Sequence, residues 1–211
     1  MEFSAPRPRR LIVGISGASG IGYGIRALQI LRELGIETHL VMTRAAEMTL
    51  VYESPLRIEE VRALATVYHP IGDIGATIAS GSFRTQGMVI APCSVKTLSE
   101  IASGACQTLL TRSADVCLKE RRRLVLMVRE TPLHLGHLRS MVAVTEMGGI
   151  IMPPVPAFYA APARLEDVID HSVSRALELL GIETEGHAEW QPPRGANRLD
   201  LQPKIASESK D

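Results

Sequence analysis

The sequence predicts an α/β fold with a parallel sheet between two layers of helices. Short, β-rich apolar runs alternate along the chain with longer segments of helical periodicity, which is typical of βαβ units. The apolar runs are also nearly continuous, as expected for strands buried on both faces. We expect residues 11–190 to form a single domain, residues 1–10 a flexible N-terminus and residues 191–211, rich in polar residues, a disordered tail.

The elements follow from periodicity and from their stop signals. Gly35 and Gly181 end two of the helical segments, and Pro92 is expected to end a strand. The expected strands are 11–15, 36–42, 88–91, 124–128 and 150–152. The expected helices are 21–34, 44–53, 58–64, 94–101, 109–122, 135–147 and 165–180. This order predicts a three-layer, Rossmann-like or flavodoxin-like sheet with helices on both faces.

Composition excludes several classes of protein. Lys+Arg and Asp+Glu both total 23 among 211 residues, and zero net charge argues against nucleic-acid binding. No apolar run is long enough to span a membrane. Cys93, Cys106 and Cys117 form no paired motif, so we interpret them as small core residues of a protein in a reducing cytoplasm.

Ligands of parallel sheets bind beyond the carboxyl ends of the strands, so the segments directly after strands are the candidate site. The first, 14–20, reads GISGASG and is followed by Gly22. Glycines allow close backbone approach, and a following helix N-terminus attracts a phosphate. A phosphate or flavin loop and a plain tight turn are about equally favoured. The spacing is not G-x-G-x-x-G, and Glu37 is a weak ribose-binding candidate, so a nicotinamide dehydrogenase is least favoured.

Three further segments follow strands. Segment 92–97 (PCSVKT) supplies hydroxyls at a helix start, where a simple capping motif is the more economical interpretation. Arg129 and Glu130 follow five apolar residues; Arg suits a phosphate, and a structural ion pair is the alternative. Segment 153–159 (PPVPAFY) offers aromatic rings to an apolar or cationic group. His134 and His137 lack further ligands for a metal, which favours a capping or packing role.

Taken together, these strings resemble the UbiX/Pad family of flavin prenyltransferases. The matching strings lie at 13–20, 80–82, 88–99, 114–122, 128–134 and 152–159, in order, from about residue 11 to 190. The resemblance implies a cytoplasmic enzyme, a homo-oligomer of dodecameric size, that joins dimethylallyl phosphate to reduced FMN and adds a fourth ring without a metal. Prenylated FMN then serves a UbiD-type decarboxylase, as in ubiquinone synthesis or aromatic acid metabolism.

The resemblance also assigns roles to residues. It implies that FMN is bound by Gly17, Ala18, Ser19, Thr43, Ser94, Val95, Lys96, Thr97 and Arg129. It implies that the substrate is bound by Lys119, Arg129, Glu130, Tyr159, Arg175 and Trp190. Ser19, Glu53, Lys119 and Glu130 are the implied catalytic residues, with Glu53 managing protons. Thr43-Arg44 stands where the family often has Ser-Lys, a change that keeps the hydroxyl.

These roles are chemically coherent. Fixed positive groups stabilise a departing phosphate, and Lys119, Arg129 and Arg175 are such groups. Either Glu53 or the departing phosphate takes the proton at ring closure. Two alternatives stay open: a flavin-dependent cysteine decarboxylase on the same fold, and a non-catalytic flavin carrier subunit of a decarboxylase. A flavin carrier does not need a second phosphate-binding cluster. A cysteine decarboxylase would have a substrate-recognition motif with Met and Asn after a proline, and this sequence lacks that motif.

Overall fold

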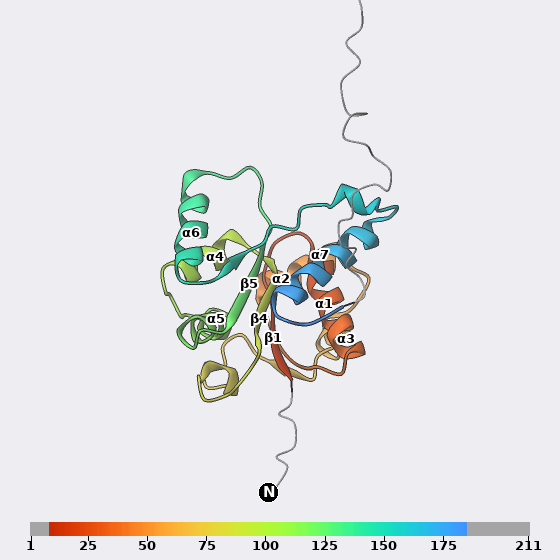
Figure 1. The fold of residues 1–211 in the computed structure, drawn as a ribbon. Coiled ribbons are helices and arrows are strands. Elements are labelled where there is room, and N and C mark those ends of the chain that lie inside the picture. Colours follow the sequence, from red (N-terminus) through yellow and green to blue (C-terminus); the bar gives the residue numbers. More distant parts are fainter. Residues whose placement is uncertain (1–8, 185–211) are drawn as a thin grey trace, which may run out of the picture.

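The computed structural model describes residues 9–184. Its strands form a single sheet flanked by helices (Figure 1). The strands are β1 (Arg10–Ile15), β2 (Glu37–Met42), β3 (Val67–His69), β4 (Gly87–Cys93), β5 (Arg123–Val128) and β6 (Ile150–Ile151). The helices are α1 (Ile21–Glu33), α2 (Arg44–Glu53), α3 (Ile58–Arg62), α4 (Val95–Ala102), α5 (Leu109–Lys119), α6 (Leu135–Glu146) and α7 (Leu165–Leu179), with short 3-10 turns η1 (Thr77–Ala79) and η2 (Phe158–Ala160).

The sheet runs β3-β2-β1-β4-β5-β6, and every pair of neighbours is parallel. The chain winds outward from β1 to β3 and then returns to place β4 on the other side of β1. The strand order therefore reverses between β1 and β4, and a crevice forms beyond the carboxyl ends at that point. This arrangement confirms the predicted α/β class with a parallel, Rossmann-like sheet.

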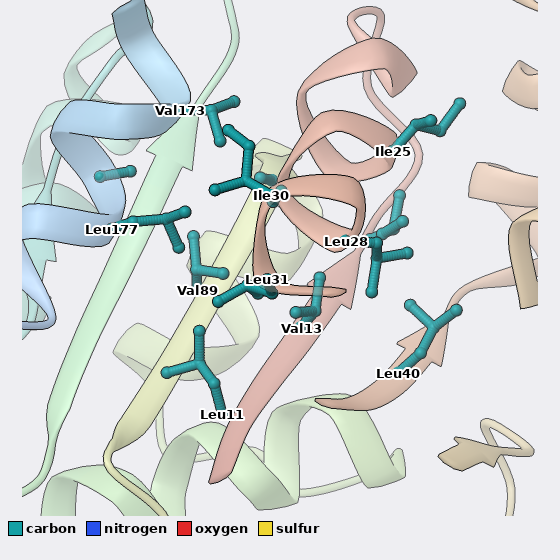
Figure 2. Packing of buried hydrophobic residues seen from close by; sticks show 14 of the residues in the cluster. Leu11, Val13, Ile25, Leu28, Ile30, Leu31, Leu40, Val89, Val173 and Leu177 are labelled. Carbon is teal, nitrogen blue, oxygen red and sulfur yellow. The ribbon is translucent and has the colours of Figure 1, made fainter. Parts of the chain in front are cut away.

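Two apolar cores lie on the two faces of the sheet. On one face, Leu11, Val13 and Val89 pack under α1 and α7, as Figure 2 shows. On the other face, Ile12, Met88 and Leu124 pack under α4, α5 and α6. Successive residues of a strand thus serve opposite cores, which explains why the strands read as unbroken apolar runs. Within residues 9–184, no helix is both long and apolar enough to cross a membrane.

Two strands differ from the sequence prediction. β3 was not predicted, because only three residues pair and Val67 is 36% exposed. β4 does not stop before Pro92 but continues to Cys93, with a register irregularity after Ile90. Pro92 has no N–H to donate and lies within this irregularity, where a proline is accommodated in a strand, while its carbonyl still accepts from the backbone N–H of Ser16.

Two boundaries also differ. The helix expected at 109–122 ends at Lys119, because Arg121 adopts a left-handed backbone conformation with φ of 57°. The flexible N-terminus expected at 1–10 is too long by at least one residue, since Arg10 starts β1 and pairs with Glu37. The rest of that segment, apart from Arg9, and the tail expected at 191–211 lie outside the described residues.

Candidate active site

A cavity of about 620 Å³ opens beyond the carboxyl ends of β1, β2, β4 and β5. Its volume lies in the range of small-molecule and cofactor sites. The segments after these four strands each contribute to the wall. The lining residues include Gly17, Ala18, Ser19, Thr43, Ser94, Val95, Lys96, Thr97, Arg129 and Glu130. All nine residues that the sequence assigns to FMN therefore lie around one cavity.

Ser16 joins the first and third of these segments. Its buried hydroxyl donates to the Pro92 carbonyl at 3.0 Å and accepts from the backbone N–H of Ser94 at 2.7 Å. The two loops are consequently fixed relative to each other before any ligand binds. Gly17 is required beside this joint, because a Cβ there would lie 2.2 Å from the Cβ of Ala45 at the start of α2.

Hydroxyl groups in the cavity also start its helices. Thr43 Oγ1 accepts from the backbone N–H of Ala46 at the start of α2, and Ser94 Oγ accepts from that of Thr97 at the start of α4. The capping role expected for Ser94 is confirmed. A cap uses only acceptor capacity, so the Thr43 hydroxyl keeps a proton to donate to a ligand, whereas Ser94 donates to Thr97 Oγ1 at 3.2 Å.

Glu53, at the end of α2, caps the helix that follows the glycine loop. Its Oε2 accepts from the backbone N–H of Gly20 at 2.8 Å and of Ile21 at 3.0 Å. Burial raises the pKa of Glu53, but hydrogen bonds from Ser19, Ile21 and Gly20 and the charge of Arg129 together lower it below the usual value. A carboxylate thus already occupies the N-terminus of α1, where the glycine motif alone suggested a phosphate.

Arg129 follows β5 directly, and its backbone N–H donates to the Cys93 carbonyl at 3.0 Å. Glu130 accepts from the backbone N–H of Thr131 at 3.0 Å. Among the ion pairs of residues 9–184, none joins Arg129 to Glu130, so the structural ion pair considered for them is not formed. Both side chains line the cavity instead.

Besides Glu53, which does not line the cavity, four residues assigned to the substrate or its chemistry lie away from it or outside the described part. Lys119 ends α5 beside the start of β5, roughly 20 Å from Arg129 by the length of that strand. Tyr159, 53% exposed, contacts His171, with its hydroxyl 3.3 Å from Nε2. Arg175 pairs with Glu178 on α7. Trp190 lies outside the described residues.

The cavity has five lining residues that were not assigned to it. They are Arg44, Ala45, Ile71, Glu100 and Thr108. Arg44 was noticed only as a departure from the family. Ile71 was missed because it follows the unpredicted β3, and Thr108 because its role as the N-cap of α5 was not recognised. For Ile71 and Thr108 the signal was a position shortly after a strand or just before a helix, whereas Ala45 and Glu100 lie inside α2 and α4, where no such signal exists.

The structure also tests the roles that the sequence suggested for Glu37, the cysteines and His134. Glu37 lies at the start of β2, bound to Arg10 and His39, so it cannot bind a ribose beyond the strand's end. Cys106 is exposed, which corrects its assignment to the core, while Cys93 and Cys117 are buried and burial raises the pKa of Cys117 to about 12. His134 caps α6 by accepting from Gly136 N, as expected.

Comparisons with known proteins agree with this geometry. The model of the flavoprotein family matches residues 4–177. Flavin prenyltransferase UbiX of Neisseria meningitidis is 59% identical over 183 residues, covering 87% of this chain and 97% of its own. A crystal structure of AnUbiX (PadA1) in complex with FMN and dimethylallyl pyrophosphate is 51% identical with a TM-score of 0.87, over 88% of this chain and 99% of that one.

A second solved structure carries information on assembly. It is a dodecameric FMN-dependent UbiX-like decarboxylase from Escherichia coli O157:H7, 47% identical with a TM-score of 0.85, matched over 87% of this chain and all of its own. Identities of this size over nearly whole chains exceed what a shared fold alone produces. The chain therefore belongs to the flavoprotein family and, within it, to the UbiX flavin prenyltransferases.

Proposed function

We propose that this chain joins the dimethylallyl group of dimethylallyl phosphate to reduced FMN, making the prenylated FMN that UbiD-type decarboxylases use. The observation that carries the proposal is the single cavity beyond β1, β2, β4 and β5, which gathers all nine predicted flavin residues, Arg129 among them, together with Glu130. The Neisseria meningitidis relative is named a flavin prenyltransferase, and the AnUbiX crystal structure contains FMN with dimethylallyl pyrophosphate.

The cavity fits FMN in size and in chemistry. Its wall combines backbone of the Gly17–Ser19 loop, which lacks bulky side chains, with hydroxyls of Thr43, Ser94, Thr97 and Thr108. Arg44 and Arg129 add two positive charges, from segments after β2 and β5 on the two sides of the β1–β4 switch point. FMN requires small loop residues beside its flat ring, and it requires hydrogen-bond donors for its phosphate and for the carbonyl edge of the ring.

When bound, reduced FMN supplies the nucleophilic ring atoms and the π face for an allylic cation. The chain's part is to stabilise the phosphate as its C–O bond breaks, because the negative charge on the leaving group grows in that step. Arg129 lines the cavity and can do so from within the subunit. Lys119 and Arg175 are the other two cations proposed for this phosphate.

The position of Lys119 requires a second copy of the chain. It ends α5 shortly before β5 begins, and therefore lies at the amino edge of the sheet, whereas the cavity lies at the carboxyl edge. A lysine side chain cannot reach roughly 20 Å, so Lys119 meets a phosphate only in the cavity of a neighbouring subunit. Tyr159 and Arg175 also lie outside the chain's own cavity. Tyr159 is 53% exposed and the Arg175 side chain 49%, so both are accessible to a neighbouring subunit in the same arrangement.

The surface of α6 supports self-association. Leu135, Leu138 and Val142, spaced along one face of this helix, are 59%, 45% and 56% exposed. A contiguous apolar stripe of this kind is typical of a protein interface. We therefore propose that the chain assembles into a homo-oligomer, dodecameric like its E. coli relative, with active sites between subunits.

Glu53 is the proposed proton acceptor. Its pKa is lowered and it is ionised at neutral pH, so it is ready to receive a proton but not to donate one. Ser19, which is hydrogen-bonded to Glu53 and lines the cavity, provides the link between the carboxylate and the bound ligand. For Glu130, which lines the cavity, we propose a role at the substrate phosphate, where it would orient a cation or hold a phosphate proton.

A UbiD-type decarboxylase of ubiquinone synthesis or aromatic acid metabolism is the proposed recipient, and the cytoplasm the proposed location, from cysteine usage. The cysteine decarboxylase and flavin carrier alternatives are less favoured. Neither needs the cations Lys119 and Arg175 at a second phosphate site.

The decisive experiment is anaerobic incubation of the protein with reduced FMN and dimethylallyl phosphate, followed by mass spectrometry of the extracted flavin. A mass gain of one C5H8 unit, absent with oxidised FMN or with an Arg129→Ala variant, is the expected result. Tight FMN binding without any mass gain would contradict the proposal and favour a carrier or a decarboxylase. Cysteine-ended peptides would then be the substrates to try.

A further inference from the structure

The loop that precedes β4 is held against the end of α5 by arginine side chains. We name residues 80–83 the Ser80–Phe83 loop. Arg122 donates from Nη1 to the Phe83 carbonyl at 2.7 Å and from Nη2 to the Gly81 carbonyl. Ten residues earlier in the chain, near the start of α5, Arg112 Nε donates at 3.2 Å to the carbonyl of Ala79, the residue directly before this loop. The backbone of this exposed loop is thus fixed from one side by two guanidinium groups.

Gly81 touches the side chains that end α5. A Cβ built on Gly81 would lie 2.1 Å from Glu120 Oε1 and 2.8 Å from Lys119 Nζ, so a side chain cannot be added unless those groups move. Lys119 and Glu120 form an ion pair at 2.5 Å, and their side chains are 44% and 36% exposed. The ammonium group therefore rests between the backbone of Gly81 and a carboxylate.

An exposed lysine does not normally keep one position. Its four-carbon side chain has many rotamers, and an exposed ion pair alone contributes little to fixing them. Contact with a rigid loop restricts the ammonium group further. A charge held in place before the substrate arrives stabilises a leaving phosphate more than a mobile one, because the cost of ordering it is already met.

We propose that Gly81 and Arg122 are positioning residues for Lys119: Arg122 fixes the loop, and the bare backbone of Gly81 seats the ammonium that meets the substrate phosphate. This inference rests on the proposed function, in which Lys119 binds the phosphate of dimethylallyl phosphate. It explains why a glycine stands between two serines on a loop that lies far from the chain's own flavin cavity. Neither residue touches substrate.

Gly81→Ala is the direct test. The atoms that its Cβ would meet are side-chain ends of Lys119 and Glu120 and not backbone, so the fold is retained and these two groups are displaced. We expect the KM for dimethylallyl phosphate to rise roughly tenfold, the fold-change of one charged hydrogen bond. The kcat at saturating substrate, the Kd for FMN and the Tm are expected to stay close to wild type. Gly75→Ala, whose Cβ has only one neighbour at 3.7 Å, is the matched control and should leave KM unchanged.

A second pair of variants covers the loop anchor. Arg122→Gln should raise the same KM, and Arg122→Lys, which keeps the charge and one donor, should restore part of the loss. In a Lys119→Ala background, Gly81→Ala should add no further effect, because a residue that acts through Lys119 cannot act without it.

The possible outcomes separate this inference from the proposed function. If Lys119→Ala raises the KM but Gly81→Ala and Arg122→Gln do not, the positioning role is wrong and the proposed function stands. Additive effects of Gly81→Ala and Lys119→Ala would also overturn it. If Lys119→Ala leaves the KM unchanged, the assignment of Lys119 to the substrate phosphate fails, and the positioning role fails with it.

Discussion

Glu53 Oε2 lies 3.0 Å from the backbone nitrogen of Ile21, so the carboxylate at the end of α2 caps the first helix of the fold. The same oxygen accepts from Gly20 N at 2.8 Å. The glycine loop is thereby held between a strand and a negative charge. Because these two N–H groups are already bound, we expect a phosphate of the cofactor to bind elsewhere in the cavity, near Arg44 or Thr97.

The cap predicts a pH-dependent contribution to stability. The pKa of Glu53 is lowered in the folded protein, so its contribution is present above the unfolded-state pKa and is lost as pH falls through the folded-state pKa. Glu53→Gln should lower the free energy of unfolding by about 0.5–1 kcal/mol at pH 7. Denaturant unfolding at pH 7 and near pH 3 checks this. A difference between wild type and variant that stays constant over that range would show that the charge is not responsible.

The same residue has a separate kinetic prediction. If Glu53 accepts the proton at ring closure, Glu53→Gln should slow formation of the final product about a hundredfold, a typical effect of losing a general base. The Kd for FMN and the KM for dimethylallyl phosphate should change little, since Glu53 does not line the cavity. Rapid-quench mass spectrometry with optical detection of the closed ring measures this step. A wild-type rate would assign the proton to the departing phosphate.

Gly17 is predicted to be essential for the flavin cavity. A Cβ there meets Ala45 Cβ at 2.2 Å and the Ala45 backbone at 3.0 Å, which no rotamer change relieves. Gly17→Ala should therefore separate the glycine loop from the start of α2 and weaken FMN binding at least about tenfold, with a lower Tm. Absorbance titration with FMN gives the affinity. Unchanged affinity would mean that the loop does not shape the flavin site.

Arg175 is predicted to act on the substrate but not on the cofactor. Its contact with Glu178 is a half-exposed ion pair, which contributes little to stability, so Arg175→Ala should fold normally. Loss of one charged hydrogen bond to phosphate should raise the KM for dimethylallyl phosphate by roughly 10- to 100-fold, with FMN affinity unchanged. Arg164→Ala, which breaks a similar exposed pair with Asp167 on the same helix, is the control. Wild-type turnover at low substrate would contradict the assignment.

Much of the fold and of the flavin cavity was predictable from sequence, because parallel strands bring the residues after them to one edge. Ser94 and Arg129 follow apolar runs directly, and the topology then places them around one cavity with the Gly17–Ser19 loop. Thr43 has the same position after β2, but no glycine or charge pattern marked it, and only the family resemblance named it.

Other features depend on information that no local pattern contains. β3 has three pairing residues and one exposed edge, so its apolar signal is too weak to read. Glu53 reaches Gly20 across 33 positions, a contact that follows from the packing of α2 beside α1 and not from spacing. Lys119 and Arg129 are ten residues apart, yet β5 between them puts them at opposite edges of the sheet. Sequence proximity there suggests a shared site, whereas the fold separates the two residues within one subunit.

This separation gives the sharpest prediction for the assembled enzyme. Lys119→Ala and Arg129→Ala should each lose most activity when prepared alone, because every cavity then lacks one of the two cations. Co-expressed, the two variants form mixed oligomers in which some cavities receive Arg129 from one subunit and Lys119 from its neighbour. Those cavities are intact, so activity should return to roughly a quarter of wild type if subunits mix at random and one neighbour supplies Lys119.

The recovery is measured with differently tagged subunits, purified through both tags and assayed by flavin mass spectrometry. A doubly mutated Lys119→Ala/Arg129→Ala chain mixed with wild type is the control for mixing itself. Mixed oligomers that remain inactive would contradict a cavity shared between subunits, because a cavity that joins Arg129 of one chain to Lys119 of its neighbour must be intact in some of them.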